Sequence, residues 1–317
     1  MIPENKIIID CDPGQDDAVG LLLALASPSE INLVGITTVA GNVPLDKTSL
    51  NARMICDLAG RTDIPVYAGC SKPIERELIT CEKIHGETGI NGLNVFDPIT
   101  VLQKEHAVDY LVRTLKGADK DDYTLVLMGP ATNLAKAIQE EPSIKSKIRQ
   151  IVFMGGAMRE AGNHTPSAEF NILVDPEAAE IILKSGRPLI QIGLDVTHQV
   201  LSTRDRVNSI KAIGNPVALA TANMLSFFDI YDTNKYDSLG APLHDPCTIA
   251  WLIKPELFVS KRCNVSVETS SELTLGHTAV DFWHVTNRPR NVNWVYEIDA
   301  EGFYNLLIER LERFGGY

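Results

Sequence analysis

The sequence lacks the motifs that mark several common enzyme classes. Its 317 residues contain no Gly-Lys-Ser/Thr phosphate-binding loop, no G-x-G-x-x-G after a predicted strand and no G-x-S-x-G nucleophile motif. These absences disfavour enzymes that act on nucleoside triphosphates, dinucleotide-dependent enzymes and serine hydrolases. The six cysteines include no C-x-x-C pair, so we expect free thiols in a reducing compartment rather than a disulfide framework.

Positive charge and long apolar runs are also scarce. The chain has 29 Lys and Arg against 41 Asp and Glu, a formal net charge of −12. Binding to DNA or RNA depends on Lys and Arg that neutralise phosphates, so this balance argues against a nucleic-acid partner and favours a small, weakly charged one. No stretch approaches the ~20 apolar residues of a membrane span, and residues 1–6 do not have the pattern of a signal peptide. We therefore expect a cytoplasmic protein without a membrane partner.

What the sequence does contain is a cluster of carboxylates near its start. Residues 7–18 read as a short β-branched strand, a tight Pro-Gly turn and the beginning of a helix. This stretch places Asp10, Asp12, Asp16 and Asp17 at one strand end. Four carboxylates there repel one another unless a cation or several hydrogen-bond donors lie among the oxygens.

A hard cation is the simplest explanation of this cluster. The Pro-Gly turn can bring Asp17 back beside Asp12, and an all-oxygen site suits Ca²⁺ or Mg²⁺ better than Zn²⁺. The alternative is that Asp16 caps the helix, Asp17 interacts with its dipole and the other two are turn residues. One cap needs one aspartate, whereas this turn holds four.

Strands and helices alternate along most of the chain, which predicts an α/β fold with an open, mostly parallel sheet flanked by helices. Residues 264–268, 277–282 and 292–298 read as consecutive strands, so we expect a small, partly antiparallel addition within 262–298 of a single domain, 1–317. Strands are also predicted at 31–38, 64–67, 123–128, 151–154 and 189–194, and helices at 46–59, 105–116, 131–140, 216–230, 246–253 and 300–313.

Ligands of such sheets bind outside the carboxyl ends of the strands. Here those ends offer Asp12, Asn42, Met128, Met154 and Asp195. We therefore expect a polar crevice built from segments that are far apart in the sequence.

Two further segments carry polar residues with open interpretations. Asp245 precedes Pro246 in a typical helix start, so it is either a cap or another carboxylate ligand with His244 beside it. Asn163, Glu169 and Asn171 lie in a loop, where they are either turn residues or groups that bind the hydroxyls of a sugar.

Single histidines and aromatic residues give weaker signals. A loop histidine such as His85 is most often simply solvated. Tyr231 and Tyr236 can stack on a planar group, although aromatic residues near a helix end more often belong to the core.

The segment 10–18 resembles the signature of the inosine-uridine-preferring nucleoside hydrolases. Other matches follow in the order of that family and extend the resemblance over about residues 7–313. Segment 240–251 further resembles the branch that is specific for pyrimidine ribonucleosides. The matching motifs are Asp10-Cys11-Asp12-Pro13-Gly14-Gln15-Asp16-Asp17-Ala18, Gly41-Asn42, Ile84-His85-Gly86-Glu87, Met154-Gly155-Gly156, Ala168-Glu169-Phe170-Asn171, Asp175-Pro176-Glu177-Ala178 and His244-Asp245-Pro246-Cys247.

The resemblance implies a Rossmann-like nucleoside hydrolase fold and a Ca²⁺-dependent enzyme. Its reaction would split the N-glycosidic bond of a ribonucleoside, such as uridine, cytidine or inosine, into ribose and free base. It also implies a homo-oligomer, either a homotetramer or a dimer. The implied Ca²⁺ ligands are Asp12, Asp17, the carbonyl of Met128 and Asp245, and the implied ribose contacts are Asp16, Asn42, Asn163, Glu169 and Asn171.

The chemistry of the reaction is consistent with these residues. Glycosidic cleavage builds positive charge on the ribose ring, which nearby carboxylates stabilise, and Asp12 would accept a proton from the attacking water. His244 is the candidate acid for the leaving base. The remaining substrate-contact candidates are His85, Met154, Tyr231 and Tyr236.

Two other classes of protein remain open from the residues alone. A haloacid-dehalogenase-like phosphatase also places Asp-x-Asp after its first strand and uses Mg²⁺, but Gly-Thr or Gly-Val usually follows its second Asp, where Pro13-Gly14 stands here. The other is a Ca²⁺-stabilised nucleoside-binding module without catalysis. Phosphate release would identify the first, and uridine binding without ribose release the second.

Overall fold

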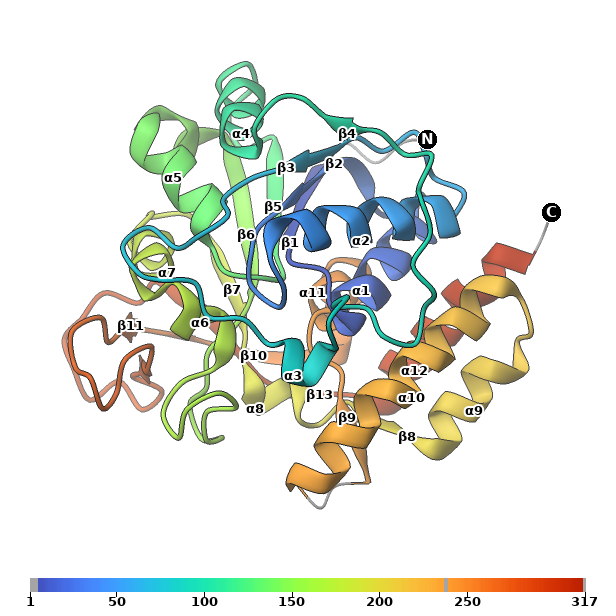
Figure 1. Cartoon of the computed structure of the whole chain (residues 1–317). Coiled ribbons are helices and arrows are strands. Elements are labelled where there is room, and N and C mark those ends of the chain that lie inside the picture. Colours follow the sequence, from blue (N-terminus) through green and yellow to red (C-terminus); the bar gives the residue numbers. More distant parts are fainter. Residues whose placement is uncertain (1–4, 237–238, 316–317) are drawn as a thin grey trace.

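The chain folds around one large twisted sheet covered by helices on both faces (Figure 1). The computed structural model describes residues 5–236 and 239–315, and only the backbone for 228–236. Within these residues, no helix combines the length and the apolar character that a membrane crossing requires. The strands of the main sheet are β1 (Lys6–Cys11), β2 (Asn32–Thr38), β3 (Val66–Ala68), β4 (Leu102–Gln103), β5 (Tyr123–Leu127), β6 (Ile148–Met154), β7 (Leu189–Ile192), β10 (Phe258–Cys263) and β13 (Val292–Ile298).

The order of the strands places a topological switch point beside β1. The sheet runs β10-β13-β7-β6-β5-β1-β2-β3-β4, and every pairing is parallel except that of β10 with β13. The chain thus builds outward from β1 through β2 on one side and through β5 on the other. The crevice at the carboxyl ends of these strands is where such sheets bind ligands. The predicted open, mostly parallel α/β sheet is therefore confirmed.

Two apolar layers hold the helices against the sheet. One packs α1, α2, α10, α11 and α12 on one face, and the other packs α4, α5 and α7 on the opposite face (Figure 1). β1 shows the cause, because its alternate side chains Ile8 and Ile9 enter opposite layers. The helices are α1 (Gln15–Leu25), α2 (Leu45–Leu58), α3 (Glu82–His85), α4 (Ala107–Lys116), α5 (Thr132–Glu140), α6 (Phe170–Val174), α7 (Pro176–Leu183), α8 (Leu194–Thr197), α9 (Arg204–Ala212), α10 (Pro216–Tyr236), α11 (Pro246–Ile253) and α12 (Ala300–Glu312).

The C-terminal strands differ in part from the expected addition. β11 (Val265–Val267) and β12 (Thr278–Val280) form a separate antiparallel pair, whereas β13 joins the main sheet in parallel with β7. A further small hairpin, β8 (Leu201–Thr203) with β9 (Gly240–Pro242), was not predicted. Its strands have three residues each, too few for a period-2 pattern.

Candidate functional site

Asp17 closes the turn between β1 and α1. Its Oδ1 accepts a hydrogen bond from the backbone N–H of Asp12 at 3.1 Å, and its Oδ2 accepts one from the N–H of Gly14 at 3.0 Å. The Nδ2 of Asn42, which follows β2, donates to the same Oδ2 at 3.1 Å. The alternative that Asp16 caps α1 is wrong, because Gly14 is the N-cap residue and Asp17 satisfies its backbone N–H.

Asp12 is held between two glycines and has one oxygen without a partner. Its Oδ2 accepts a hydrogen bond from the backbone N–H of Asn42 at 2.7 Å, while its buried Oδ1 has no hydrogen-bond partner among the described residues. A Cβ atom at Gly41 would lie 2.9 Å from Asp12 Cγ, and one at Gly129 would lie 2.7 Å from it. The absence of both side chains therefore leaves room for this carboxylate.

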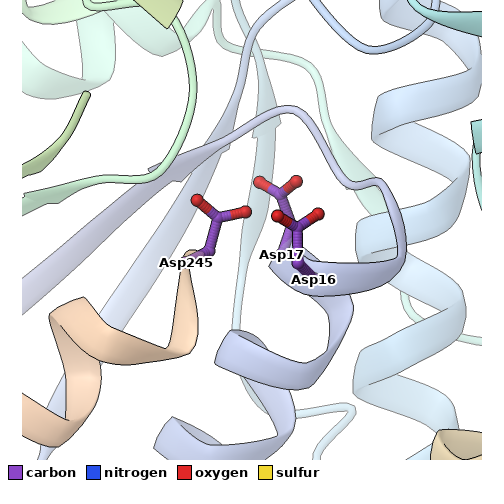
Figure 2. A group of neighbouring side chains, drawn as sticks. All are labelled: Asp16, Asp17 and Asp245. Carbon is purple, nitrogen blue, oxygen red and sulfur yellow. The ribbon is translucent and has the colours of Figure 1, made fainter. Parts of the chain in front are cut away.

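Asp245 occupies the N-cap position of α11, but its side chain does not cap the helix. Asp175 precedes Pro176 and accepts a hydrogen bond from Ala178 N at 3.0 Å, which caps α7. Asp245 precedes Pro246 at the start of α11, yet its side chain makes no capping hydrogen bond. Its carboxylate instead points toward the start of α1 (Figure 2).

Asp16, Asp17 and Asp245 come together where α1 and α11 begin (Figure 2). Each of these buried residues offers a carboxylate oxygen, and the three oxygens lie within 4.8 Å of one another. Asp12 is not part of this group of three. The carboxylate that completes the group is Asp16, to which the resemblance assigns a sugar contact.

Burial and mutual repulsion make these carboxyl groups hard to ionise. Burial, followed by the charge of Asp17, raises the pKa of Asp12 well above its usual value. Burial and the charge of Asp16 do the same to the pKa of Asp245, and burial raises the pKa of Asp16 to about 7. A bound cation would lower all three pKa values.

The donors of this cluster suit a hard metal ion. They are carboxylate oxygens, and neither Asp12 Oδ1 nor Asp16 Oδ1, both buried, has a hydrogen-bond partner within the described part of the chain. No imidazole or thiolate belongs to the group of three acids. Such an oxygen set favours Ca²⁺ or Mg²⁺ over Zn²⁺, so the residues fit a site for an alkaline-earth ion.

Asn171 joins the ends of two neighbouring strands. Its Nδ2 donates hydrogen bonds to the carbonyl of Met128, after β5, at 2.7 Å and to the carbonyl of Met154, at the end of β6, at 3.1 Å. A carbonyl oxygen has two lone pairs, so the carbonyl of Met128 can accept this bond and also contact a cation.

Glu169 is buried at the start of α6. Its Oε1 accepts a hydrogen bond from the N–H of Asn171 at 3.0 Å, and its Oε2 accepts one from the N–H of Gly156 at 3.0 Å. Burial raises the pKa of Glu169 to about 7. Asn163, at the edge of the same loop, accepts a hydrogen bond from Phe170 N at 2.9 Å. Glu169 and Asn171 are only 2% and 6% exposed, so neither is the surface turn residue that the alternative suggested.

The antiparallel pair β11–β12 holds the backbone that follows β6. The hydroxyl of Thr278, on β12, accepts a hydrogen bond from the N–H of Ala157 at 2.9 Å and donates one to the carbonyl of Ala157 at 2.6 Å. Ala157 follows Gly156, whose N–H binds Glu169. Thr278 therefore fixes the backbone that orients this carboxylate.

Two predicted histidines are held in place by polar side chains. His85, in α3, is 6% exposed, and its Nδ1 lies 2.6 Å from Oε1 of Gln15. His244 Nδ1 lies 2.7 Å from the hydroxyl of Thr197, in α8. The ring of His198 lies next to that of His244, with 6.0 Å between the two ring centroids.

One cavity brings most of the predicted residues together. Asp12 and Asp17 do not line it but are buried beside it, in contact with Asn42. The side chains of Tyr231 and Tyr236 lie outside the described residues, although α10 includes their backbone. The predicted residues that line the cavity are Asp16, Asn42, His85, Met128, Met154, Asn163, Glu169, Asn171, His244 and Asp245.

Sequence reasoning missed several residues of the cavity wall. Ile84 and Phe170 stand inside matched motifs next to predicted residues, so their neighbours were the available signal. His198 follows the strand end at Asp195 that was expected to open on the crevice, but no matched motif includes it. Cys81, Ile84, His164, Phe170, His198 and Pro242 complete the wall.

Comparisons with known proteins cover nearly the whole chain. The model of the family described as inosine-uridine preferring nucleoside hydrolase matches residues 7–305. The pyrimidine-specific ribonucleoside hydrolase RihA of Photobacterium profundum is 48% identical over 98% of this chain and 99% of its own. RihA of Shewanella sp. (strain MR-4) is 49% identical over 97% of this chain and 96% of its own.

Solved structures give the same picture of the fold. The purine-preferring ribonucleoside hydrolase from Gardnerella vaginalis superposes with a TM-score of 0.90 at 32% identity and covers 98% of this chain and 99% of its own. A plant nucleoside hydrolase, also 32% identical, superposes with a TM-score of 0.89 over the same shares of the two chains.

Proposed function

The chain belongs to the inosine-uridine preferring nucleoside hydrolase family, whose members are N-glycosyl hydrolases, and we propose that it splits pyrimidine ribonucleosides into ribose and the free base. Membership of this family removes the phosphatase and the non-catalytic binding module. The observation that carries the proposal is the group of three buried carboxylates beside a cavity lined with amides. The pyrimidine preference is supported by the names of relatives that are 48% and 49% identical.

Ca²⁺ is the proposed metal, held by Asp12, Asp17, the carbonyl of Met128 and Asp245. The unpartnered Oδ1 of Asp12 and the raised pKa values of Asp12 and Asp245 support this choice of ligands. When bound, the cation would supply positive charge that orients the vicinal hydroxyls of ribose and favours ionisation of a water molecule. A role of Asp16 in binding this ion is equally consistent with its place in the group of three.

Asp12 is the proposed general base. It would accept a proton from the water that attacks the anomeric carbon, because its Oδ1 is the oxygen left without an internal hydrogen bond. The backbone N–H of Asn42 donates a hydrogen bond to the other oxygen of Asp12, Oδ2, at 2.7 Å. This contact fixes the direction of the carboxylate before substrate arrives.

The ribose contacts are proposed for Asp16, Asn42, Asn163, Glu169 and Asn171. Positive charge develops on the ribose ring as the bond to the base breaks, and ionised carboxylates nearby stabilise that state more than the ground state. Glu169 and Asn171 are held by backbone hydrogen bonds, so they need little rearrangement when the charge appears.

His244 is the proposed partner of the leaving base. The hydroxyl of Thr197, 2.7 Å from Nδ1, fixes the ring at the wall of the cavity. The electron pair of the broken bond stays on the base, which then takes a proton from this imidazole or from water.

His85 and Met154 are further proposed contacts to the substrate, and Tyr231 and Tyr236 are proposed contacts to the base. A homotetramer or dimer is the proposed assembly, which the mass measured by light scattering would test.

A ribose-release assay tests the proposal. The panel would hold uridine, cytidine, inosine and adenosine with their 2′-deoxy counterparts, each with added Ca²⁺ and with a chelator. We expect pyrimidine ribonucleosides to react fastest, the deoxy compounds to react poorly and the chelator to stop turnover. Equal rates on ribo- and deoxyribonucleosides would contradict the proposed hydroxyl contacts.

The variant Asp12→Asn tests the proposed base. Loss of a general base costs about 10²- to 10⁴-fold in rate, and loss of a metal ligand adds to that cost. Asp119→Asn, an exposed aspartate on the surface, is the matched control and should keep the parent rate. Near-parent turnover by Asp12→Asn would refute the assignment.

A further inference from the structure

Gln15 has no role in the proposed ligand set or in the sugar contacts, yet its side chain makes three hydrogen bonds, two of them fully buried. It is the first residue of α1 and is fully buried. Its Nε2 donates to the carbonyl of His85 at 3.0 Å and to the carbonyl of Asn91 at 3.2 Å. Its Oε1 lies 2.6 Å from Nδ1 of His85. This side chain therefore ties the long loop after β3 to the turn that carries the aspartates.

These contacts fix the orientation of the Gln15 amide. Both carbonyl oxygens can only accept hydrogen bonds, so the amide nitrogen must face them. A reversed amide would place Oε1 against both carbonyls and leave the amide nitrogen against the imidazole of His85. Oε1 therefore faces Nδ1, and because Oε1 is an acceptor only, Nδ1 must carry the proton.

His85 then has one proton, on Nδ1. Its ring is buried against the turn, where a Cβ atom at Gly14 would lie 2.7 Å from its Cε1 and 2.9 Å from Nδ2 of Asn42. Burial lowers the pKa of His85 to about 4, which agrees with a neutral ring at pH 7. In a neutral imidazole that is protonated at Nδ1, Nε2 presents a lone pair.

We propose that Gln15 is a positioning residue that holds His85 as the Nδ1-protonated tautomer, so that Nε2 accepts a hydrogen bond from an O–H or N–H group of the bound nucleoside. His85 lines the cavity, which gives the ring access to substrate. The identity of the ligand rests on the proposed function, whereas the tautomer does not. It follows that His85 does not donate the proton to the leaving base, and this role is left to His244 or to water.

The tautomer can be observed directly on the full-length protein loaded with Ca²⁺. Long-range ¹⁵N–¹H correlation spectra of protein labelled with ¹⁵N-histidine, recorded at pH 7, distinguish a protonated from an unprotonated ring nitrogen. The signals of His85 are those that disappear in His85→Phe. We expect a protonated Nδ1 and an unprotonated Nε2. A proton on Nε2 would overturn the proposal.

The role of Gln15 is tested by Gln15→Met, which keeps the size of the side chain and removes the amide. We expect this variant to show a mixture of both tautomers for His85 and a raised KM. Gln103→Met is the matched control, since Gln103 also binds a backbone carbonyl but lies on β4, away from the cavity. A pure Nδ1-protonated tautomer in Gln15→Met would show that Gln15 does not set it.

Two uridine analogues identify the donor on the substrate. 5′-Deoxyuridine lacks one hydroxyl, and 3-methyluridine lacks the N–H of the base. We expect the parent enzyme to lose about 10-fold in kcat/KM on one analogue, as for one neutral hydrogen bond, and His85→Phe to show no further loss on that analogue. Full additivity of both analogues with His85→Phe would refute the contact. A parent that hydrolyses no nucleoside at all would refute the proposed function instead and leave the spectra as the test of the tautomer.

Discussion

The close approach of Gly41 to Asp12 makes a sharp prediction for Gly41→Ala. The new Cβ atom would lie 2.9 Å from Asp12 Cγ, closer still to Oδ2, and 3.0 Å from Cδ of Pro130. Comfortable contacts between carbon atoms begin at about 3.5 Å, so the carboxylate must move by roughly half an ångström or more. Because Oδ2 is held by Asn42 N at 2.7 Å, this movement breaks the contact that orients Asp12.

The expected consequence is a large loss of turnover in a protein that still folds. A misplacement of about 1 Å at a catalytic group costs on the order of 10²-fold in rate, or about 2.7 kcal/mol of barrier. Overpacking of a buried site costs about 1–3 kcal/mol of folding stability. The ribose-release rate at saturating uridine and Ca²⁺ is the measurement, and circular dichroism confirms that the chain is folded.

Gly117→Ala is the matched control for this prediction. Its Cβ would lie 3.6 Å from the nearest atom, the carbonyl oxygen of Arg113, which is an ordinary contact. We expect this variant to keep the parent rate. The reasoning would be refuted by a folded Gly41→Ala whose kcat is within about threefold of the parent.

Three other features of the site make independent predictions. Asp16 and Glu169 have pKa values raised to about 7, so the metal-free folded state binds more protons than the unfolded state between about pH 4 and 7. The free energy of unfolding should therefore fall as the pH rises through this range, by up to ~1.4 kcal/mol per pH unit for each group. Urea unfolding at pH 5 and 7.5 measures this, added Ca²⁺ should weaken the dependence, and stability that rises with pH in the metal-free protein would contradict it. Thr278→Val removes both hydrogen bonds of the Thr278 hydroxyl and should lower kcat/KM about 10-fold, whereas Thr278→Ser should keep the parent value. Equal losses of kcat/KM in the two variants would show that the packing of the side chain matters and its hydrogen bonds do not. Asp175→Asn should lower the thermal midpoint, because one oxygen can still cap α7 but the new NH₂ group would face the N–H of Ile74, from which Oδ2 of Asp175 accepts a hydrogen bond at 2.9 Å. Asp245→Asn should instead raise the midpoint of the metal-free protein and abolish turnover, and the same shift in both variants would contradict their different roles.

The sequence predicts the sheet and the position of the site because both depend on local patterns. Long elements such as α2, α4 and β13 were found within about two residues of their ends, because apolar period and turn residues agree there. Parallel strands bring their carboxyl ends to one edge, so Asp12, Asn42 and Met128 had to meet once the strand order placed β1 between β2 and β5. The resemblance to a known family then assigned expected roles to these residues.

Local sequence does not predict what each polar side chain contacts. Asp175 and Asp245 stand in the same Asp-Pro context, and only the packing of α11 against α1 turns the second one toward other carboxylates. Short elements such as α8, β8 and β9 have too few residues to show a period. The hydrogen bond from Gln15 to the carbonyl of His85 joins positions 70 residues apart, and no sequence pattern within one helix or strand can predict it.

The proposed catalytic roles coincide with structural ones in this site, and this affects how its residues can be tested. Glu169 caps α6 and also holds Gly156, so an alanine there would remove a proposed sugar contact and a loop anchor together. Asn171 likewise joins the carbonyls of Met128 and Met154. Glu169→Gln removes the negative charge, but it also turns one of the two oxygens that accept backbone N–H groups into an NH₂ donor, so we expect a lower thermal midpoint as well. A charge that stabilises positive ribose should then appear as a loss in kcat, measured on the folded variant, well beyond the ~10-fold expected for one lost neutral hydrogen bond.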